Sequence, residues 1–429
     1  MPTNVNLFKY LSDRGLVHNS TPNIEKFLID NQQNVTPPKA YCGFDPSGKS
    51  LQVGNLVALL LLRRAQLHGV KPLALLGGAT GLIGDPSGKK AERSLLDLNT
   101  TQENIESIKK QISQFIDFEP GKYQAQFVNN YDWFKDFNFI QFLRDVGKHI
   151  TVNYMIAKDS VKLRMETGIS YAEFGYMLMQ GYDYLHLYEN HGCLIQLGGS
   201  DQWGNITTGI ELIRRKHGVE AHAASCPLLT DAAGNKLGKT ENGAVYLDPQ
   251  MTTPFQFFQY WLQRPDSEVI PLLKALTLLD NHTIESCEHL IKTAPEKRDS
   301  QKVLAKTLTD LVHGQDTCQS IEEASQVLFS KSPETIANLS KAGLATLAKE
   351  VPSTQISTLN GLSILDLLIN SKMCESKGEA RRHIQGNAVT INRTKITDDK
   401  LILNDDYFKN NKFILLGLGK TQLHLVIKD

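Results

Sequence analysis

Short apolar runs alternate with amphipathic stretches over the first half of this 429-residue chain, and no other feature constrains its fold as strongly. The runs AYCGF, PLALLGG and CLIQLGG have the length and residue types of buried strands. The stretches LVALLLLRRAQLHG and ITTGIELIRRKHG repeat apolar residues at helical spacing. Strands that alternate with helices form parallel sheets, so we predict an α/β fold with a parallel sheet.

The pattern changes beyond residue 250. Helical periodicity replaces the strands in FQFFQYWLQ and QKVLAKTLTDLVHG, and a weaker helical pattern follows between Ser-Pro and Pro-Ser punctuation. The last part predicts helix in ILDLLINSKMCESKGEARRHIQ, a hairpin-like strand pair in AVTINRTKI and late strands in FILLGLGKTQLHLVIKD. We therefore predict an α/β domain at 1–245, an all-α domain at 246–330, a linker at 331–355 and a small α+β domain at 356–429.

Composition sets limits on partners and compartment. Lysine plus arginine and aspartate plus glutamate both number 46, so any basic surface that binds nucleic acid must be local. None of the six cysteines has metal-site spacing, which argues against a structural metal. The N-terminus lacks an apolar signal core, and the longest apolar run, Leu56 to Leu62, is too short to span a bilayer. We expect a cytoplasmic protein with reduced cysteines and no membrane partner.

The octet GFDPSGKS, Gly43 to Ser50, fits the P-loop pattern G-x-x-x-x-G-K-[ST]. A P-loop needs a helix that begins at its Lys-Ser pair, because the phosphates bind to the free N–H groups of that helix. Here Gly54 follows four residues later, the apolar helical pattern begins only around Asn55, and Pro46 lies inside the supposed cradle. The context disfavours a P-loop, and a P-loop hydrolase stays open as an alternative.

The stretch SYAEFGYMLMQGYD predicts a helix with polar groups on one face. Ser170 and Glu173 have capping-box spacing at its start. Tyr176, Gln180 and Asp183 follow at i, i+4 and i+7, so they lie on one side of an otherwise apolar helix. Such a face lines either a pocket for a small polar ligand or a satisfied buried polar cluster.

Three loops carry further polar groups. GGATGLIGDPSGKKAER follows the predicted strand PLALL, and GGSDQWGN follows CLIQL and precedes a helix. Loops after the strands of such a sheet lie at its carboxyl edge, where these folds bind nucleotides. The segment GNKLGKT brings two lysines and a hydroxyl together beside glycines, which suits a lid over a triphosphate.

Three motifs resemble the nucleotide-binding signatures of class I aminoacyl-tRNA synthetases, in the form found in tyrosyl-tRNA synthetases. In chain order they are YCGFDPSGKSLQVGN, GGSDQWGN and KLGKT. The family's HIGH tetrapeptide corresponds to Gln52-Val53-Gly54-Asn55, so side-chain amides replace both histidines. Amides can still donate hydrogen bonds to phosphate oxygens, with less charge available. The resemblance spans nearly the whole chain and implies ATP-dependent attachment of L-tyrosine to tRNA(Tyr) through tyrosyl adenylate.

The resemblance also implies roles for individual residues, with Tyr41 and Asp183 on the phenol hydroxyl and Asp201 on the ribose of ATP. The implied tyrosine-binding residues are Tyr41, Asp85, Tyr176, Gln180, Asp183, Gln196 and Gln202. The implied ATP-binding residues are Gly43, Asp45, Ser47, Gly54, Gly199, Asp201 and Lys239. The implied catalytic residues, which stabilise the polyphosphate, are Gln52, Asn55, Lys236, Lys239, Thr240, Lys89 and Arg93. Mg²⁺ would accompany ATP as part of the substrate complex, without metal ligands from the protein.

The segment Ser363 to Ile396 resembles the small RNA-binding module, of ribosomal-protein type, at the end of bacterial tyrosyl enzymes. Six basic and two acidic residues lie between Lys372 and Lys395, and this local excess suits phosphate contacts. The implied RNA-binding residues are Lys372, Lys377, Arg381, Arg382, Arg393 and Lys395. A solvated helix face is the alternative.

The resemblance implies that the domain at 1–245 is Rossmann-like, with an insertion around 120–165 that forms the dimer interface in the family. The stretch Asn129 to Ile156 lies in this insertion, which implies a homodimer, although the aromatic residues there suit interior packing equally well. Two further interpretations stay open. One is the related tryptophanyl enzyme, against which Tyr41 and Asp183 favour tyrosine. The other is an RNA-binding protein that keeps the fold without catalysis, against which the intact Asp201 and Lys236 argue.

Overall fold

The computed structural model describes residues 6–31, 34–87, 95–165, 168–230, 234, 236–240, 243–329, 332, 334–410, 412–419 and 422–429. The chain divides into two compact units. The first comprises residues 1–253 and 260–308, and the second comprises residues 254–259 and 309–429.

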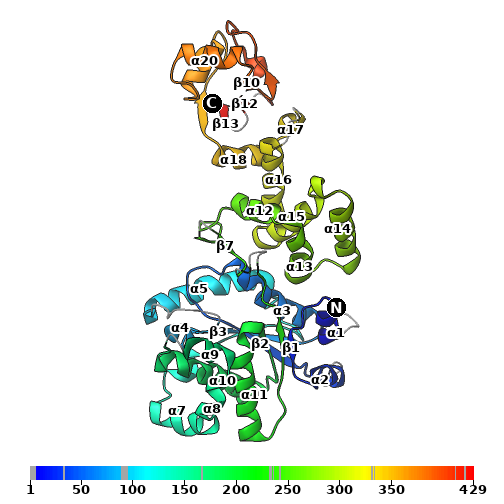
Figure 1. Cartoon of the computed structure of the whole chain (residues 1–429), viewed down its shortest axis with the longest axis vertical. Helices are drawn as coiled ribbons and strands as arrows, with labels where there is room; N and C mark the ends of the chain where they lie inside the picture. The colour runs from blue at the N-terminus through cyan, green and yellow to red at the C-terminus, as the bar shows by residue number, and fades with distance from the viewer. Residues whose placement is uncertain are drawn as a thin grey trace. The chain divides into compact units, whose positions relative to one another are not determined.

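A six-stranded sheet in the order β1-β6-β5-β2-β3-β4 forms the centre of the first unit (Figure 1). Its strands are β1 (Asn19–Ser20), β2 (Lys39–Phe44), β3 (Lys71–Leu76), β4 (Gln126–Asn129), β5 (Ile195–Gly199) and β6 (His222–Cys226). All neighbouring pairs are parallel except the short β1–β6 pair. The predicted strands are β2, β3 and β5, and the parallel sheet is confirmed.

The strand order reverses between β2 and β5. Strands β3 and β4 continue the sheet beyond β2, whereas β6 continues it beyond β5. Connections that leave the ends of β2 and β5 therefore diverge and leave a crevice, which is where sheets of this kind bind ligands. Strand order alone places a site near Phe44 and Gly199, where these two strands end.

Helices cover both faces of the sheet (Figure 1). One face carries α3 (Leu56–Leu67) and α5 (Leu98–Phe115), and the other carries α10 (Tyr171–His191) and α11 (Trp203–His217). Tyr41 and Leu73 of the sheet share a buried core with Tyr184 and Leu187 of α10. Since both faces are covered, the strands are apolar on both sides, and this explains why they appear in the sequence as continuous apolar runs.

The first unit also contains shorter elements and most of the helical middle region. Its other helices are α1 (Leu7–Asp13), α2 (Ile24–Asn31), α4 (Thr80–Ile83), α6 (Tyr131–Phe134), α7 (Phe139–Asp145), α8 (Val152–Ile156), α9 (Asp159–Met165), α13 (Asp266–Leu276), α14 (Asn281–Thr293) and most of α15 (Asp299–His313), while α12 (Pro254–Leu262) crosses the boundary. Its short elements are the 3-10 turns η1 (Val53–Asn55), η2 (Gly147–His149), η3 (Ser200–Gln202) and η4 (Pro295–Lys297) and the strands β7 (Lys239–Thr240) and β8 (Gly243–Ala244). Among the described helices of the whole chain, none is long and apolar enough to cross a membrane.

The second unit joins helices to a five-stranded sheet in the order β11-β10-β12-β13-β9. Its elements are α16 (Gln315–Phe329), α17 (Glu334–Ala337), α18 (Lys341–Glu350), β9 (Ser353–Ile356), α19 (Ile364–Asn370), α20 (Lys377–Gln385), β10 (Val389–Ile391), β11 (Thr394–Lys395), η5 (Asp405–Tyr407), β12 (Phe413–Leu418) and β13 (Gln422–Lys428). The hairpin β10–β11 and the late strands β12 and β13 are confirmed. The stretch expected as a linker differs from a bare tether, because it holds α17, α18 and most of β9, which pairs with β13.

The stretch predicted as helical from Ile364 to Gln385 is divided into two helices. Lys372, just beyond α19, has a positive φ of 54°, and this left-handed conformation turns the chain. Ser376 then caps α20, where its hydroxyl accepts a hydrogen bond from the Glu379 N–H at 3.2 Å. Apolar residues on both sides of the turn face one core, so the apolar pattern continues across it.

Two buried arginines, Arg14 and Arg64, cap the carboxyl end of α13. Arg64 donates hydrogen bonds to the carbonyl oxygens of Ala275 at 2.9 Å and Thr277 at 2.8 Å, and Arg14 donates to that of Leu279 at 2.7 Å. The last carbonyl groups of a helix have no intrahelical partners, so cationic donors satisfy them and oppose the helix dipole. Burial lowers the pKa of Arg64 to about 10, so the guanidinium stays charged at neutral pH. Because Arg64 belongs to α3, these bonds fasten the helical region to the sheet.

We predict that Arg64→Ala lowers the free energy of unfolding by about 3 kcal/mol, because it removes the arginine donor of the Ala275 carbonyl and opens a cavity. Arg63→Ala is the matched control, since Arg63 is only half-buried and donates to the Gln66 side chain at 2.8 Å. The control should cost less than about 1 kcal/mol. Urea unfolding followed by circular dichroism measures the free energy of unfolding of both variants. Equal losses in the two would show that the Arg64 bonds to the end of α13 do not stabilise the fold.

Candidate active site

A cleft of about 790 Å³ lies in the first unit at the carboxyl ends of β2 and β5. Its lining includes most of the site residues predicted from the sequence: Tyr41, Gly43, Asp45, Ser47, Gln52, Gly54, Asn55, Asp85, Tyr176, Gln180, Asp183, Gln196, Gly199, Asp201, Gln202 and Lys236. Lys89 and Arg93 lie outside the described residues, and so do the side chains of Lys239 and Thr240. Motifs that are distant in the sequence therefore meet at one cleft.

The octet GFDPSGKS does not form a P-loop. The buried hydroxyl of Ser50 donates to the Leu51 carbonyl at 2.8 Å and accepts a hydrogen bond from the Asp248 N–H at 3.1 Å. Within residues 34–87 no helix begins at Lys49 or Ser50, and α3 begins at Leu56, after the turn η1, as predicted. Without a helix N-terminus at the Lys-Ser pair there is no phosphate cradle of the P-loop type.

A buried carboxylate, Asp183, lines the cleft near Tyr41. Asp183 is 1% exposed and accepts hydrogen bonds from Asn130 Nδ2 at 3.1 Å and Trp133 Nε1 at 3.0 Å. Burial raises the pKa of Asp183 well above its usual value, and the two donors act in the opposite direction. The buried hydroxyl of Tyr41 has no hydrogen-bond partner among the described residues. Since buried polar groups are normally paired, this part of the cleft is suited to a hydroxyl group of a ligand.

Asn130 and Trp133 are site residues that the sequence analysis did not identify. Asn130 also donates to Thr80 Oγ1 at 2.9 Å and accepts a hydrogen bond from the Ala79 N–H at 2.7 Å, so its amide is fixed on both sides. The sequence left two locations open for the segment Asn129 to Ile156, a dimer interface or the interior. Asn130 and Trp133 contact the interior, since both donate to the buried Asp183. The sequence contains one signal for a site here: two consecutive asparagines directly follow an apolar run, at the carboxyl edge of the sheet.

The polar face predicted for α10 lines the cleft. Tyr176 donates a hydrogen bond to Asp45 Oδ2 at 2.8 Å, and Gln180 accepts one from Asn205 Nδ2 at 2.9 Å. Burial raises the pKa of the Tyr176 hydroxyl, so this group stays protonated and acts as a donor. The face lines the cleft and also belongs to a hydrogen-bonded polar cluster, and the small polar ligand expected there stays a prediction.

Acceptor groups gather along the same part of the cleft. Asp85 accepts hydrogen bonds from Gln202 Nε2 at 2.6 Å and from the Ser87 N–H at 3.0 Å. Gln196 is 3% exposed, and its Oε1 has no partner in the part of the chain that the structure describes. Carboxylate and amide oxygens in this arrangement are suited to an ammonium group.

Gln52 and Asn55 lie where α3 begins. Asn55 Oδ1 accepts a hydrogen bond from the Gln52 N–H at 2.9 Å, and because a backbone N–H only donates, the amide nitrogen of Asn55 remains as a donor. The Val53 N–H donates to the Val245 carbonyl at 3.0 Å, which joins this turn to the segment after KLGKT. The first signature and the lysine segment are therefore parts of one hydrogen-bonded structure.

Ser170 caps α10 as predicted, since its hydroxyl accepts a hydrogen bond from the Glu173 N–H at 3.2 Å. The second half of the predicted capping box is replaced by an ion pair between Glu173 and Arg164 at 2.7 Å, with side chains only 3% and 5% exposed. This pair ties α9 to the first turn of α10, ahead of Tyr176.

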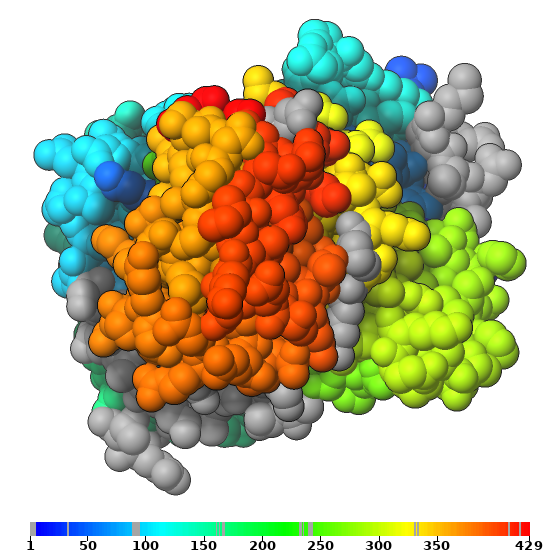
Figure 2. All heavy atoms as spheres, turned by 90° about the horizontal axis from the view of Figure 1, so that it is seen from above, coloured from blue at the N-terminus to red at the C-terminus, as the bar shows by residue number. Residues whose placement is uncertain are grey.

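The basic residues predicted to bind RNA lie in the sheet-bearing part of the second unit, coloured orange to red in Figure 2. Five of them are exposed: Lys372, Lys377, Arg381, Arg382 and Lys395. Arg393 is half-buried and donates to the carbonyl oxygens of Val327 at 2.6 Å and Leu328 at 3.0 Å, at the end of α16. Its guanidinium therefore caps a helix of the same unit.

Fold and cleft together define a class: an α/β protein with a cleft at the switch point of a parallel sheet, which is where folds of this class bind nucleotides. The family described as "tRNA synthetases class I (W and Y)" matches residues 33–330, and the "Tyrosine--tRNA ligase SYY-like C-terminal domain" matches residues 343–426. Tyrosine-tRNA ligase 1 of Bacillus subtilis (strain 168) is 45% identical over 423 residues, 98% of this chain and 99% of that protein. The ligase of Bacteroides fragilis (strain YCH46) is 45% identical over 433 residues, 99% of this chain and 100% of that protein.

Solved structures agree. A C-terminally truncated mitochondrial tyrosyl-tRNA synthetase from Aspergillus nidulans matches with a TM-score of 0.66 at 28% identity, over 76% of this chain and 94% of that structure. The chain belongs to the tyrosine-tRNA ligase family of class I aminoacyl-tRNA synthetases.

We predict that Trp133→Phe raises the KM for tyrosine about tenfold, because a hydrogen bond to a charged group contributes about 1.5–3 kcal/mol. Loss of the indole donor also raises the pKa of Asp183 further, so protonation as the pH falls removes the acceptor sooner. The increase in KM should therefore be larger at pH 6.5 than at pH 8. Tyrosine-dependent ATP–pyrophosphate exchange measures both effects.

Trp261→Phe is the control for loss of a buried indole, since Trp261 lies in the helical region and not in the cleft lining. It should leave the KM for tyrosine unchanged. An unchanged KM in Trp133→Phe as well would mean that Asp183 does not need the indole donor.

Proposed function

We propose that this enzyme attaches L-tyrosine to tRNA(Tyr) in two steps, first forming tyrosyl adenylate from tyrosine and ATP and then transferring the tyrosyl group to the tRNA. Membership of the tyrosine-tRNA ligase family supports the overall reaction. One observation carries the choice of amino acid: the buried Tyr41 hydroxyl, without a protein partner among the described residues, beside the Asp183 carboxylate. Because the reaction serves translation, we place it in the cytoplasm.

Tyrosine fits the cleft with its phenol group between Tyr41 and Asp183. Phenylalanine has the same ring but would leave the buried Tyr41 hydroxyl unpaired, at a cost of about 1–3 kcal/mol, and would add no donor to those that Asp183 already has in Asn130 and Trp133. The ammonium group of tyrosine is then assigned to Tyr176, Gln180, Gln196 and the Asp85 carboxylate, and Gln202 to its carboxyl group. This arrangement leaves the carboxylate of tyrosine directed toward the part of the cleft lined by Asp201 and Lys236.

We assign ATP to the part of the cleft lined by Gly43, Asp45, Ser47, Gly54 and Gly199, with its ribose on Asp201. Gln52, Asn55 and Lys236 then serve the phosphates, and the resemblance adds Lys239, Thr240, Lys89 and Arg93. Catalysis in this scheme consists of positioning the tyrosine carboxylate for attack at the α-phosphorus and stabilising charge as pyrophosphate leaves. Mg²⁺ arrives with ATP, bound to phosphate oxygens.

Amino-acid-dependent ATP–pyrophosphate exchange with the full-length protein tests the proposal. We predict exchange with tyrosine and none above background with phenylalanine or tryptophan. Exchange with tryptophan alone would assign the chain to the tryptophanyl branch. No exchange from folded protein that binds tRNA would indicate an RNA-binding protein without catalysis, and phosphate release without an amino acid would indicate a hydrolase.

We propose that the α+β region at 356–429 contacts tRNA through its exposed basic residues, Lys372, Lys377, Arg381, Arg382 and Lys395. Lys377 and Arg381 also pair with Asp366 at 2.6 Å and Asp399 at 2.8 Å, and such exposed pairs exchange readily for phosphate. In the same scheme residues 1–245 form the catalytic domain, 246–330 the helical domain on the anticodon side and 331–355 the connection between modules.

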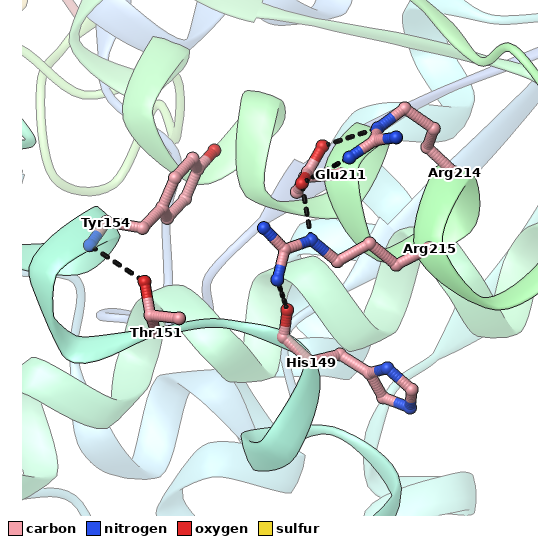
Figure 3. Close-up of polar contacts among 6 residues, drawn as sticks. All are labelled: His149, Thr151, Tyr154, Glu211, Arg214 and Arg215. Atoms are coloured by element: carbon pink, nitrogen blue, oxygen red, sulfur yellow. Dashed lines mark hydrogen bonds and ion pairs between the residues drawn. The ribbon is translucent and has the colours of Figure 1, made fainter.

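We also propose that the enzyme is a homodimer. Phe139, Ile140 and Val152 on α7 and α8 are 61%, 79% and 58% exposed, and such a concentration of apolar side chains on neighbouring short helices is typical of an interface. Figure 3 shows how this region is held: Arg215 of α11 pairs with Glu211 and also donates to the His149 carbonyl at 2.6 Å.

Ile140→Asp is predicted to convert the dimer into a monomer, because the interface would have to bury a charge without a partner. Val35→Asp is the control, since Val35 is 94% exposed and lies outside these helices. Multi-angle light scattering at micromolar concentration gives the mass of each. A monomeric parent protein, or a dimeric Ile140→Asp variant, would contradict the assignment.

A further inference from the structure

Lys236 and Asp201 neutralise each other in the cleft. Lys236 Nζ lies 2.9 Å from Asp201 Oδ2, and the two side chains are 35% and 22% exposed. Both residues line the cleft. The function proposed above gives them separate partners, since Asp201 serves the ribose of ATP and Lys236 serves the phosphates. The contact between them therefore cannot persist unchanged once ATP is bound.

The backbone directly after Lys236 is held in place. The Leu237 N–H donates to the Leu229 carbonyl at 3.0 Å, and the Gly238 N–H donates to the Tyr260 hydroxyl at 3.1 Å. Gly238 has a positive φ of 88°, a conformation that suits glycine. Lys236 can therefore leave Asp201 by rotation of its side chain, without movement of the backbone that follows it.

Asp201 is held as well. A Cβ atom on Gly199 would lie 2.7 Å from Asp201 Oδ1, so the carboxylate packs closely against the end of β5. One carboxylate oxygen lies against that backbone and the other accepts the Lys236 ammonium group. A vicinal diol can donate two hydrogen bonds side by side, one to each oxygen of a carboxylate, and the Lys236 ammonium group already holds Oδ2 of Asp201. In that arrangement the ribose and the ammonium group compete for Oδ2.

We propose that the Lys236–Asp201 ion pair is a latch that the ribose of ATP opens. The diol takes the carboxylate, and the displaced ammonium group turns to the phosphates of the same nucleotide. Recognition of the sugar thus delivers a cation to the reacting end. The inference rests on the function proposed above, because it requires that Asp201 binds the ribose.

Adenosine, which has the diol but no phosphates, separates the two effects. Lys236→Met keeps the length of the side chain and removes its charge, so it should bind adenosine about two- to fivefold more tightly than the parent, the range expected for a partly exposed ion pair. The same variant should bind ATP more weakly, because it lacks the cation for the phosphates. The affinity for 2′,3′-dideoxyadenosine should not change. Isothermal titration calorimetry with the full-length protein measures all three.

Asp201→Asn completes a double-mutant cycle. In the Asp201→Asn background, Lys236→Met should no longer improve the binding of adenosine. If Asp201→Asn leaves the preference for adenosine over 2′,3′-dideoxyadenosine intact, the ribose role of Asp201 is wrong, and the latch with it. If the preference is lost but Lys236→Met alone does not tighten adenosine, the ribose role stands and the latch is wrong.

Discussion

Every group of the candidate active site depends on the reversal of strand order between β2 and β5. Parallel strands bring their carboxyl ends to one edge, and the reversal opens a crevice there that the connecting loops do not fill. Tyr41 on β2, Gln196 on β5 and the loop after β3 that carries Asp85 meet at this edge because the strands are neighbours. The Arg64 bonds to α13 fix the far end of α3, whose near end carries Asn55, so the helical region is connected to the same edge.

Burial of the Asp183 carboxylate carries the largest free-energy cost in this arrangement. Transfer of a carboxylate from water into a protein costs several kcal/mol, and two donors, Asn130 and Trp133, recover part of it. The neighbouring Tyr41 hydroxyl has no hydrogen-bond partner among the described residues. In the proposed function a ligand that brings one hydroxyl group to this point pairs with both side chains. Selectivity for tyrosine would then follow because a ligand without that hydroxyl leaves the Tyr41 hydroxyl unpaired.

The sequence predicts those features that depend on local spacing. Apolar runs predict β2, β3 and β5, and the spacing of Tyr176, Gln180 and Asp183 predicts their common face. Asn130 and Trp133 escape detection because they act on Asp183 from about 50 residues away, and no local pattern connects them. Glu173 has capping-box spacing, but a stronger partner, Arg164, takes its carboxylate. Arg393 contributes to a basic cluster in the sequence, yet its guanidinium caps α16, because the carbonyl groups at a helix end need donors.

The amides at Gln52 and Asn55 change how charge is distributed in the cleft. Neutral donors stabilise phosphate oxygens through hydrogen bonds alone, so in the proposed function the positive charge for leaving pyrophosphate comes from lysine and arginine side chains and from the Mg²⁺ that arrives with ATP. A lysine that faces an empty cleft gains from any nearby carboxylate, and Asp201 is the carboxylate that Lys236 contacts. In the proposed function the nucleotide satisfies both charges at once, with a diol for Asp201 and phosphates for Lys236. Because the amides at Gln52 and Asn55 carry no charge, the proposed latch supplies positive charge from Lys236, which the ribose releases from Asp201 when ATP binds.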